Sequence, residues 1–146
     1  MTIEVRYYSK SGNTKIIADA IAQAVGVTAK QVDDPLDEPV ELLFLGGGVY
    51  AGGMKRKIKK FLKNITAFQV ENIAVFSTSA GDDTIYAPAK EILDDGSTTL
   101  LEDVFHAPGE FLKFNKGRPN KEDLGGAAAF ALNVIKKLEA NKGEAQ

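Results

Sequence analysis

Polar residues gather directly after the first apolar run of the chain, where residues 9–14 read Ser-Lys-Ser-Gly-Asn-Thr. Three hydroxyl groups lie within these six residues, and the glycine lets the backbone wrap closely around a ligand. A helix that begins here presents unpaired amide hydrogens and partial positive charge, so a phosphate binds there readily. The same residue types are also good helix caps, which is the simpler interpretation. The density of hydroxyls favours a phosphate site.

A glycine-rich segment, Gly-Gly-Gly-Val-Tyr-Ala-Gly-Gly at residues 46–53, follows a later apolar run. The spacing Gly46-x-Gly48-x-x-Ala51 formally meets the dinucleotide-binding fingerprint, but it follows the third expected strand and precedes a basic helix. The match is therefore weak. The alternative without a ligand is a close strand-to-helix turn with Tyr50 packed at its edge.

A third polar segment, residues 77–84, reads Ser-Thr-Ser-Ala-Gly-Asp-Asp-Thr. Its hydroxyls and carboxylates can contact a polar ligand edge, although a plain turn that caps the next helix explains the same residues. Tyr86, just beyond it, is expected either to line one side of a ligand site or to lie in the core.

Several other chemistries are excluded or disfavoured. The chain has no cysteine and one histidine, His106, which excludes disulfides, thiolate ligands and a histidine-cluster zinc site. We expect His106 to be a strand-end residue rather than a catalytic base. The G-x-x-x-x-G-K-[ST] motif of nucleotide hydrolases is absent, and no acid follows the first strand as in receiver domains. We therefore expect no catalytic side chain and no metal.

The expected elements alternate between strands and helices, which predicts a doubly wound α/β sandwich. Strands are expected at 2–8, 27–32, 41–46, 73–76 and 98–105, with helical patterns at 16–24, 58–65, 89–93 and 123–141. The three polar segments follow the first, third and fourth strands. They should therefore meet at the carboxyl edge of the sheet, where such folds bind their ligands. The length of 146 residues suits a single domain, 1–146.

Tyr8 and the segment 9–14 resemble the phosphate loop of flavodoxins, [ST]-x-[ST]-G-x-T, which holds the 5'-phosphate of FMN. The length resembles the short-chain flavodoxins. The resemblance implies a flavodoxin-like three-layer sandwich with a five-stranded parallel sheet of order 2-1-3-4-5. It also implies an FMN-binding flavoprotein of electron transport.

The resemblance further implies which residues contact FMN. They are Ser9, Lys10, Ser11, Gly12, Asn13 and Thr14; Gly48, Val49, Tyr50, Ala51, Gly52 and Gly53; and Thr78, Ser79, Ala80, Gly81 and Asp82. In this scheme Tyr50 stacks on the ring, and Gly52 and Gly53 let a peptide unit reorient when the flavin gains a proton. Asp82 or Asp83 lowers the potential of the reduced flavin. Residues 79–81 supply no aromatic wall, so one ring face is expected to be more open, as suits a reductase.

The net charge of -2 conceals two clusters of opposite sign. The basic one comprises Lys55, Arg56, Lys57, Lys59, Lys60 and Lys63, and the acidic one Asp33, Asp34, Asp37, Glu38 and Glu41. The basic cluster is expected to be a solvated helix face or a docking surface for an acidic partner or a phosphorylated pyridine nucleotide. Arg118 is left open between a structural ion pair and a substrate contact, while Asn120 is expected to cap the last helix.

Three functions follow from these patterns. The first is an FMN-binding electron-transfer protein, and the second is an FMN-dependent NAD(P)H:quinone reductase or a flavodoxin-like porphyrinogen oxidase. The third is a non-redox interaction module, which the hydroxyls of residues 9–14 disfavour. Partners are expected to be a redox protein or a small-molecule electron acceptor, with no nucleic acid and no membrane span. The chain has no cysteine, and its first residues do not have the pattern of a signal peptide. Both observations predict a soluble oxidoreductase of the cytoplasm.

Overall fold

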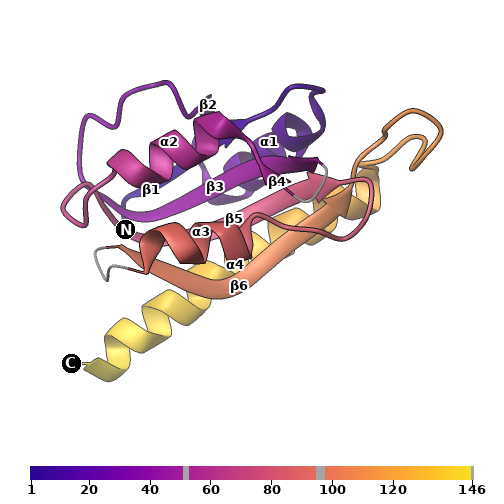
Figure 1. Ribbon diagram of the computed structural model, residues 1–146. Coiled ribbons are helices and arrows are strands. Elements are labelled where there is room, and N and C mark those ends of the chain that lie inside the picture. The colour runs from indigo at the N-terminus through magenta and orange to yellow at the C-terminus, as the bar shows by residue number, and fades with distance from the viewer. Residues whose placement is uncertain (51–52, 95–97, 146) are drawn as a thin grey trace.

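The computed structural model describes residues 1–50, 53–94 and 98–145 and places them in three layers (Figure 1). The central layer is a parallel sheet with the strand order β2-β1-β3-β5-β6, to which β4 adds a short antiparallel pair with β3. The strands are β1 Ile3–Tyr8, β2 Ala29–Gln31, β3 Val40–Tyr50, β4 Gly53–Met54, β5 Val70–Ser79 and β6 Thr99–Pro108. Apart from β4, this is the predicted five-stranded order.

Two pairs of helices cover the two faces of the sheet (Figure 1). They are α1 Asn13–Val25 and α4 Lys121–Ala145 on one face, and α2 Arg56–Asn64 and α3 Tyr86–Leu93 on the other. Strand β3 supplies both cores: the fully buried Phe44 packs with α1 and α4, whereas Leu43 and Leu45 pack with α2 and α3. This explains why residues 42–45 of the strand are all apolar, as expected for a parallel strand that is buried on both faces.

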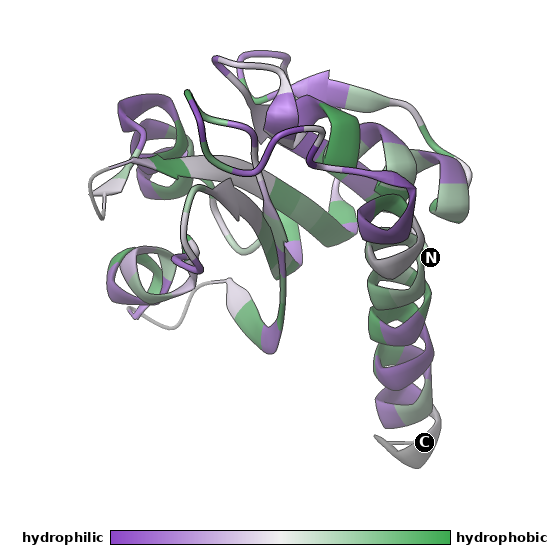
Figure 2. Cartoon of the chain, turned by 90° about the vertical axis from the view of Figure 1, so that its right-hand side faces the viewer, coloured by the Kyte–Doolittle hydropathy of each residue, from purple (hydrophilic) through white to green (hydrophobic). Residues whose placement is uncertain are grey.

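The helices follow the periodicity of the sequence. Helix α1 ends where Gly26 adopts a left-handed conformation with φ 82°, and its amide closes the last turn onto the Ala22 carbonyl. Along α4, the buried residues Ala127, Ala131 and Val134 recur at steps of four and three. Figure 2 accordingly shows green and purple alternating along this helix.

The glycine-rich segment differs from its prediction, because its first glycines belong to strand β3 instead of a loop. Gly46, Gly47 and Gly48 pair with Phe76, Ser77 and Thr78 of β5. A Cβ atom on Gly46 would lie 2.0 Å from the Phe76 ring, so glycine is needed there for close packing. The turn that a dinucleotide fingerprint requires is therefore absent at this position.

Strand β3 ends in a tight return. Val49 pairs with Met54 and Tyr50 with Gly53, so β3 and β4 form an antiparallel hairpin at the carboxyl edge of the sheet. Ala51 and Gly52, which were also predicted to contact the ligand, lie outside the described residues. Strand β5 likewise extends through Ser79, further than predicted. The polar loop toward α3 therefore begins only at Ala80.

Candidate functional site

The segments that follow β1, β3, β5 and β6 meet at the carboxyl edge of the sheet, which faces the viewer in Figure 2. A cavity of about 300 Å³ opens between them. Its lining residues are Asn13, Val49, Tyr50, Thr78, Ser79, Ala80, Gly109, Glu110 and Phe111. Three of the four segments are those that the sequence predicted, and the fourth, after β6, was not.

The N-terminus of α1 at this edge carries no side-chain cap. The N-cap residue is Gly12, whose φ of 95° suits glycine and which makes no side-chain cap; Ser11 Oγ accepts a long hydrogen bond, of 3.5 Å, from the amide of Asn13, the first helical residue. Ser9 Oγ instead accepts a hydrogen bond from the Gly12 amide at 3.0 Å, which shapes the loop. The amides of Thr14 and Lys15 find no acceptor among the described residues. The capping interpretation is therefore wrong, and the helix end is open to an anion.

Thr14 and Thr78 join this helix end to strand β5. Both side chains are buried, and their hydroxyl oxygens lie 2.7 Å apart. Two hydroxyls carry two hydrogens, and one hydrogen bond between them uses one. The second hydrogen stays available for an acceptor placed beside the pair.

Asn13 fastens the same helix end to the segment after β6. Its side-chain amide donates to the Glu110 carbonyl at 3.1 Å, and the Gly109 amide donates to the Ser79 carbonyl at 3.0 Å. A Cβ on Gly109 would lie 2.7 Å from the Asn13 amide nitrogen, so only glycine allows this approach. The segments after β1, β5 and β6 are thus connected to one another.

Tyr50 and Phe111 supply aromatic surface to the cavity. Their ring centroids lie 6.0 Å apart in an edge-to-face arrangement, and both rings are partly exposed. Lys55 places its ammonium group 4.1 Å from the centroid of Tyr50, a cation–π contact. Phe111 thus adds a second aromatic ring to the cavity lining, from the segment after β6.

The loop that carries Phe111 is held by hydrogen bonds. Phe111 and Phe114 exchange backbone hydrogen bonds, and the Asn115 side chain donates to the carbonyls of Ala80 and Gly109 at 2.9 and 3.2 Å. Figure 1 shows this loop projecting beyond the sheet. Phe111 and Phe114 lie close together directly after the last strand, and this is the sequence signal that could have indicated the loop.

Arg118 closes this loop against α4. Its guanidinium donates two hydrogen bonds to the Asp123 carboxylate, at 2.7 and 2.6 Å, and holds the pKa of Asp123 below its usual range. Asn120 and Asp123 cap the helix reciprocally, each side chain accepting the backbone amide of the other. Arg118 thus forms a structural ion pair with Asp123, and the predicted cap at Asn120 is confirmed.

His106 lies behind the cavity, near the end of β6. Its Nε2 atom is 2.7 Å from Ser79 Oγ. Burial lowers the pKa of His106, and the carboxylates of Asp82, Asp83 and Asp123 oppose that shift. Burial therefore favours the neutral form of the imidazole.

The remaining predicted site residues lie around the cavity. Gly48 lies below it, since a Cβ there would approach Tyr50 to 3.3 Å. Gly53 belongs to β4, and Lys10 and Ser11 are exposed on the loop before α1. Gly81 and Asp82 are exposed and do not line the cavity.

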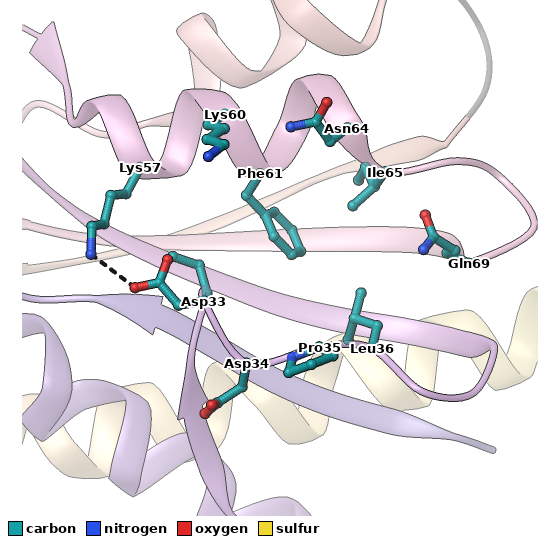
Figure 3. Close-up of a pocket in the computed structure, with 11 residues that line it drawn as sticks. Asp33, Asp34, Pro35, Leu36, Lys57, Lys60, Phe61, Asn64, Ile65 and Gln69 are labelled. Carbon is teal, nitrogen blue, oxygen red and sulfur yellow. Dashed lines mark hydrogen bonds and ion pairs between the residues drawn. The ribbon is translucent and has the colours of Figure 1, made fainter.

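A second cavity, of about 360 Å³, lies between α2 and the acidic segment 33–38 (Figure 3). Lys57 reaches across its mouth to Asp33 at 2.8 Å. Arg6, buried in β1, donates to the Pro35 carbonyl at 3.2 Å and holds the segment down. The acidic cluster therefore lies alongside the basic helix, although the sequence offered no sign that the two are neighbours.

Two kinds of feature are missing from the part of the chain that the structure describes. In residues 1–50, 53–94 and 98–145, no group of three or more histidine, aspartate or glutamate side chains is placed to hold a metal ion. No helix within these ranges has the length and apolar character needed to cross a membrane.

Comparison with known proteins agrees with this geometry. A family model described as a flavodoxin domain matches residues 5–145. An uncharacterized protein of Methanocaldococcus jannaschii is 28% identical over an alignment of 137 residues, and the match covers 85% of this chain and 91% of that protein.

Solved structures share the fold. A flavodoxin from the domain Archaea superposes with a TM-score of 0.75 at 22% identity, covering 95% of this chain and 99% of its own. Oxidised flavodoxin 2 from Bacillus cereus superposes with a TM-score of 0.68 at 22% identity, covering 94% of this chain and 99% of its own. A WrbA-like flavodoxin protein from Agrobacterium tumefaciens superposes with a TM-score of 0.70 at 16% identity, covering 96% of this chain and 99% of its own.

Proposed function

Because the chain belongs to the flavodoxin domain family over residues 5–145, we propose that it binds FMN and acts as an electron-transfer protein. The observation that carries this proposal is the uncapped N-terminus of α1 beside a cavity with aromatic walls. Neither feature alone identifies a ligand. Together they match a ligand that has a phosphate at one end and an aromatic ring at the other.

The phosphate fits the helix end. The amides of Thr14 and Lys15 offer two donors, and the helix dipole favours negative charge at this position. The hydroxyl hydrogen left over from the Thr14–Thr78 pair supplies a further donor. The Ser11 hydroxyl is exposed on the same loop and can turn toward the ligand. These donors are the residues to which the proposal assigns phosphate binding.

The flavin ring fits the cavity. Val49, Tyr50 and Phe111 offer apolar and aromatic surface, whereas Thr78 and Ser79 line the side formed by β5. When bound, the flavin itself supplies the redox chemistry, accepting and releasing electrons. The side chains need only bind and orient the ring and set the charge around it. His106, Asp82 and Asp83 are ionisable groups near this surface, and Glu110 lines the cavity itself.

Reconstitution tests the proposal. The protein is mixed with FMN, desalted, and examined by visible absorption and by the quenching of flavin fluorescence. We expect FMN to be retained with a shifted spectrum, and riboflavin, which lacks the phosphate, to bind more weakly. If neither flavin binds above the level seen with an unrelated protein of the same charge, the proposal is wrong.

A second function, reduction of a small molecule on the same site, is favoured by the partial exposure of both cavity aromatics. Tyr50 is 36% and Phe111 44% exposed, so a substrate ring can reach them. In this form the protein is an FMN-dependent NAD(P)H:quinone reductase or a porphyrinogen oxidase. Rapid oxidation of NAD(P)H by the purified, FMN-loaded protein supports it. Dependence on a separate reductase supports electron transfer to a redox protein partner in the cytoplasm.

A further inference from the structure

The one histidine of the chain lies behind Ser79, a residue that lines the cavity. His106 lies opposite Ser77 in the pairing of β5 with β6, and Ser79 follows Ser77 by two positions. Because alternate residues of a strand share a face, His106 and Ser79 project from the same side of the sheet. Their side chains meet there, with 2.7 Å between His106 Nε2 and Ser79 Oγ. Ser79 is also a lining residue of the cavity, whereas His106 is not.

The protonation of His106 decides what Ser79 offers to the cavity. A hydroxyl has one hydrogen to donate, and it accepts through two lone pairs. If neutral His106 accepts at Nε2, Ser79 spends its hydrogen on the histidine and presents only lone pairs to a ligand. Protonated His106 carries a hydrogen on both ring nitrogens and must donate at Nε2. Ser79 then accepts from His106, and its own hydrogen is free for the ligand.

We propose that His106 is a positioning residue of this site, which makes Ser79 a hydrogen-bond acceptor toward the ligand when neutral and a donor when protonated. The proposal assigns the hydrogen of the neutral imidazole to Nδ1. His106 acts only through Ser79 and does not touch the ligand. The inference takes this ligand to be a flavin, and in that respect it rests on the proposed function.

Burial and the charges around His106 act on its pKa in opposite directions. Burial favours the neutral ring and lowers its pKa. Asp82 and Asp83 from the loop after β5, and Asp123 from α4, face it with negative charge and limit that shift. Asp123 is engaged by Arg118, which weakens its influence. The pKa of His106 is therefore expected below its usual value of 6.5, and protonation follows as the pH falls through it.

The pyrimidine edge of a flavin has an N3–H group that needs an acceptor, between two carbonyl groups that need donors. With neutral His106, Ser79 suits N3–H. Since the ligand then prefers the neutral form of the histidine, its affinity is full above the pKa of His106 and falls as the pH drops through it. By the same linkage, flavin binding lowers the pKa of His106.

Nuclear magnetic resonance of the apoprotein tests the pair itself, because a single histidine gives a single set of ring signals. The nitrogen shifts report the neutral tautomer, and a titration reports the pKa. We expect the hydrogen on Nδ1. We also expect Ser79→Ala to raise the pKa of His106, because the substitution removes a donor that stabilises the neutral ring. A hydrogen on Nε2, or a pKa that falls in Ser79→Ala, would overturn the proposal. The control is Thr28→Ala, which removes an exposed hydroxyl far from the cavity.

Riboflavin affinity against pH tests the consequence, since riboflavin has no group that titrates between pH 5 and 8. In the parent protein, affinity should fall about five- to tenfold from pH 7.5 to below the pKa of His106, the loss that one mispaired hydrogen bond causes. In His106→Gln the affinity should not change with pH, because the glutamine carbonyl accepts from Ser79 at every pH. If only FMN binds tightly enough, its phosphate titrates alike in both proteins, and their difference reports the same effect.

The outcomes separate the two proposals. Flavin binding with the same pH profile in the parent and His106→Gln overturns the role of His106 and leaves the proposed function standing. Failure of every flavin to bind overturns the proposed function and the ligand assigned here, while the apoprotein tautomer still decides whether His106 orients Ser79.

Discussion

The change Gly46→Ala tests whether the first glycines of segment 46–53 serve strand packing, as the structure has it, or a ligand loop. A Cβ on Gly46 would lie 2.0, 2.2 and 2.6 Å from three ring atoms of Phe76. That ring is fully buried against α1 and α4 in the core. Alanine therefore cannot be accommodated by turning a side chain toward solvent.

The size of the effect follows from these distances. To restore ordinary contact at 3.4 Å, the Phe76 ring has to move by roughly 1.4 Å through a close-packed core. Overpacking of this kind costs about 1–3 kcal/mol, and the reduced freedom of the unfolded chain returns at most about 1 kcal/mol. Because the clash is severe and the ring fully buried, we expect a net loss of about 2–3 kcal/mol in the free energy of unfolding.

Urea unfolding followed by circular dichroism measures this loss, with Gly81→Ala as the matched control. A Cβ on Gly81 meets nothing within 4 Å. The control should therefore change stability by less than about 0.5 kcal/mol. The double variant Gly46→Ala with Phe76→Leu should be less destabilised than the sum of the single changes by about 1–2 kcal/mol, because leucine leaves room for the new methyl group.

Two results would refute this reasoning. A Gly46→Ala protein as stable as Gly81→Ala would show that the strand does not pack against Phe76 as described. Strict additivity in the double variant would show that the loss arises elsewhere. If Gly46→Ala instead left stability unchanged and abolished flavin binding, the ligand-loop interpretation of this glycine would stand.

Three further predictions concern the site. Ser11→Ala combined with Thr14→Ala should weaken FMN at least tenfold and riboflavin less than threefold, measured by fluorescence titration, because only FMN carries the phosphate; equal losses would refute the assignment. Phe111→Ala should reduce the quenching of bound flavin fluorescence while leaving the urea midpoint nearly unchanged, since the ring is 44% exposed; unchanged quenching would remove Phe111 from the site. Arg118→Gln should lower the urea midpoint at pH 7, and the gap to the parent should narrow progressively as the pH falls below about 4, because the lowered pKa of Asp123 contributes its full stability above the unfolded pKa and loses it as the pH drops through the folded pKa; a gap that stays constant down to about pH 2 would contradict the ion pair.

Much of the fold could be predicted because it depends on local patterns. Apolar residues at helical spacing placed α1 and α4, and Gly26 marked the end of α1. The continuous apolar run 42–45 indicated a strand buried on both faces, which β3 is. The strand order then followed from the resemblance of residues 8–14 to one family.

What could not be predicted depends on contacts between distant residues. Strand β3 needs a glycine at position 46 because the ring of Phe76, thirty positions away, fills the space that a side chain would take. Phe111 reaches the cavity only because Asn115 binds the Ala80 carbonyl and folds the loop back. Neither pairing leaves a trace in local spacing, so the sequence showed glycine and aromatic residues without their purpose.

The N-terminus of α1 lies between these cases. The residue types of segment 9–14 suit both a helix cap and a phosphate site, and composition cannot separate the two. The left-handed Gly12 and the positions of Ser9 and Ser11 separate them, because the serines bind the loop and leave the amides of Thr14 and Lys15 unsatisfied within the described chain.

The position of the acidic segment against α2 affects how a redox partner finds this protein. Lys57 and Asp33 meet at 2.8 Å, and charges of opposite sign continue on both sides of that contact. Beyond a Debye length, which is about 8 Å at physiological ionic strength, their fields largely cancel. The protein therefore presents neither a strongly positive nor a strongly negative face from this side to an approaching molecule. Diffusional encounter should consequently be slow and nearly independent of salt, and the choice of partner is left to the shape and chemistry of the surfaces that finally touch.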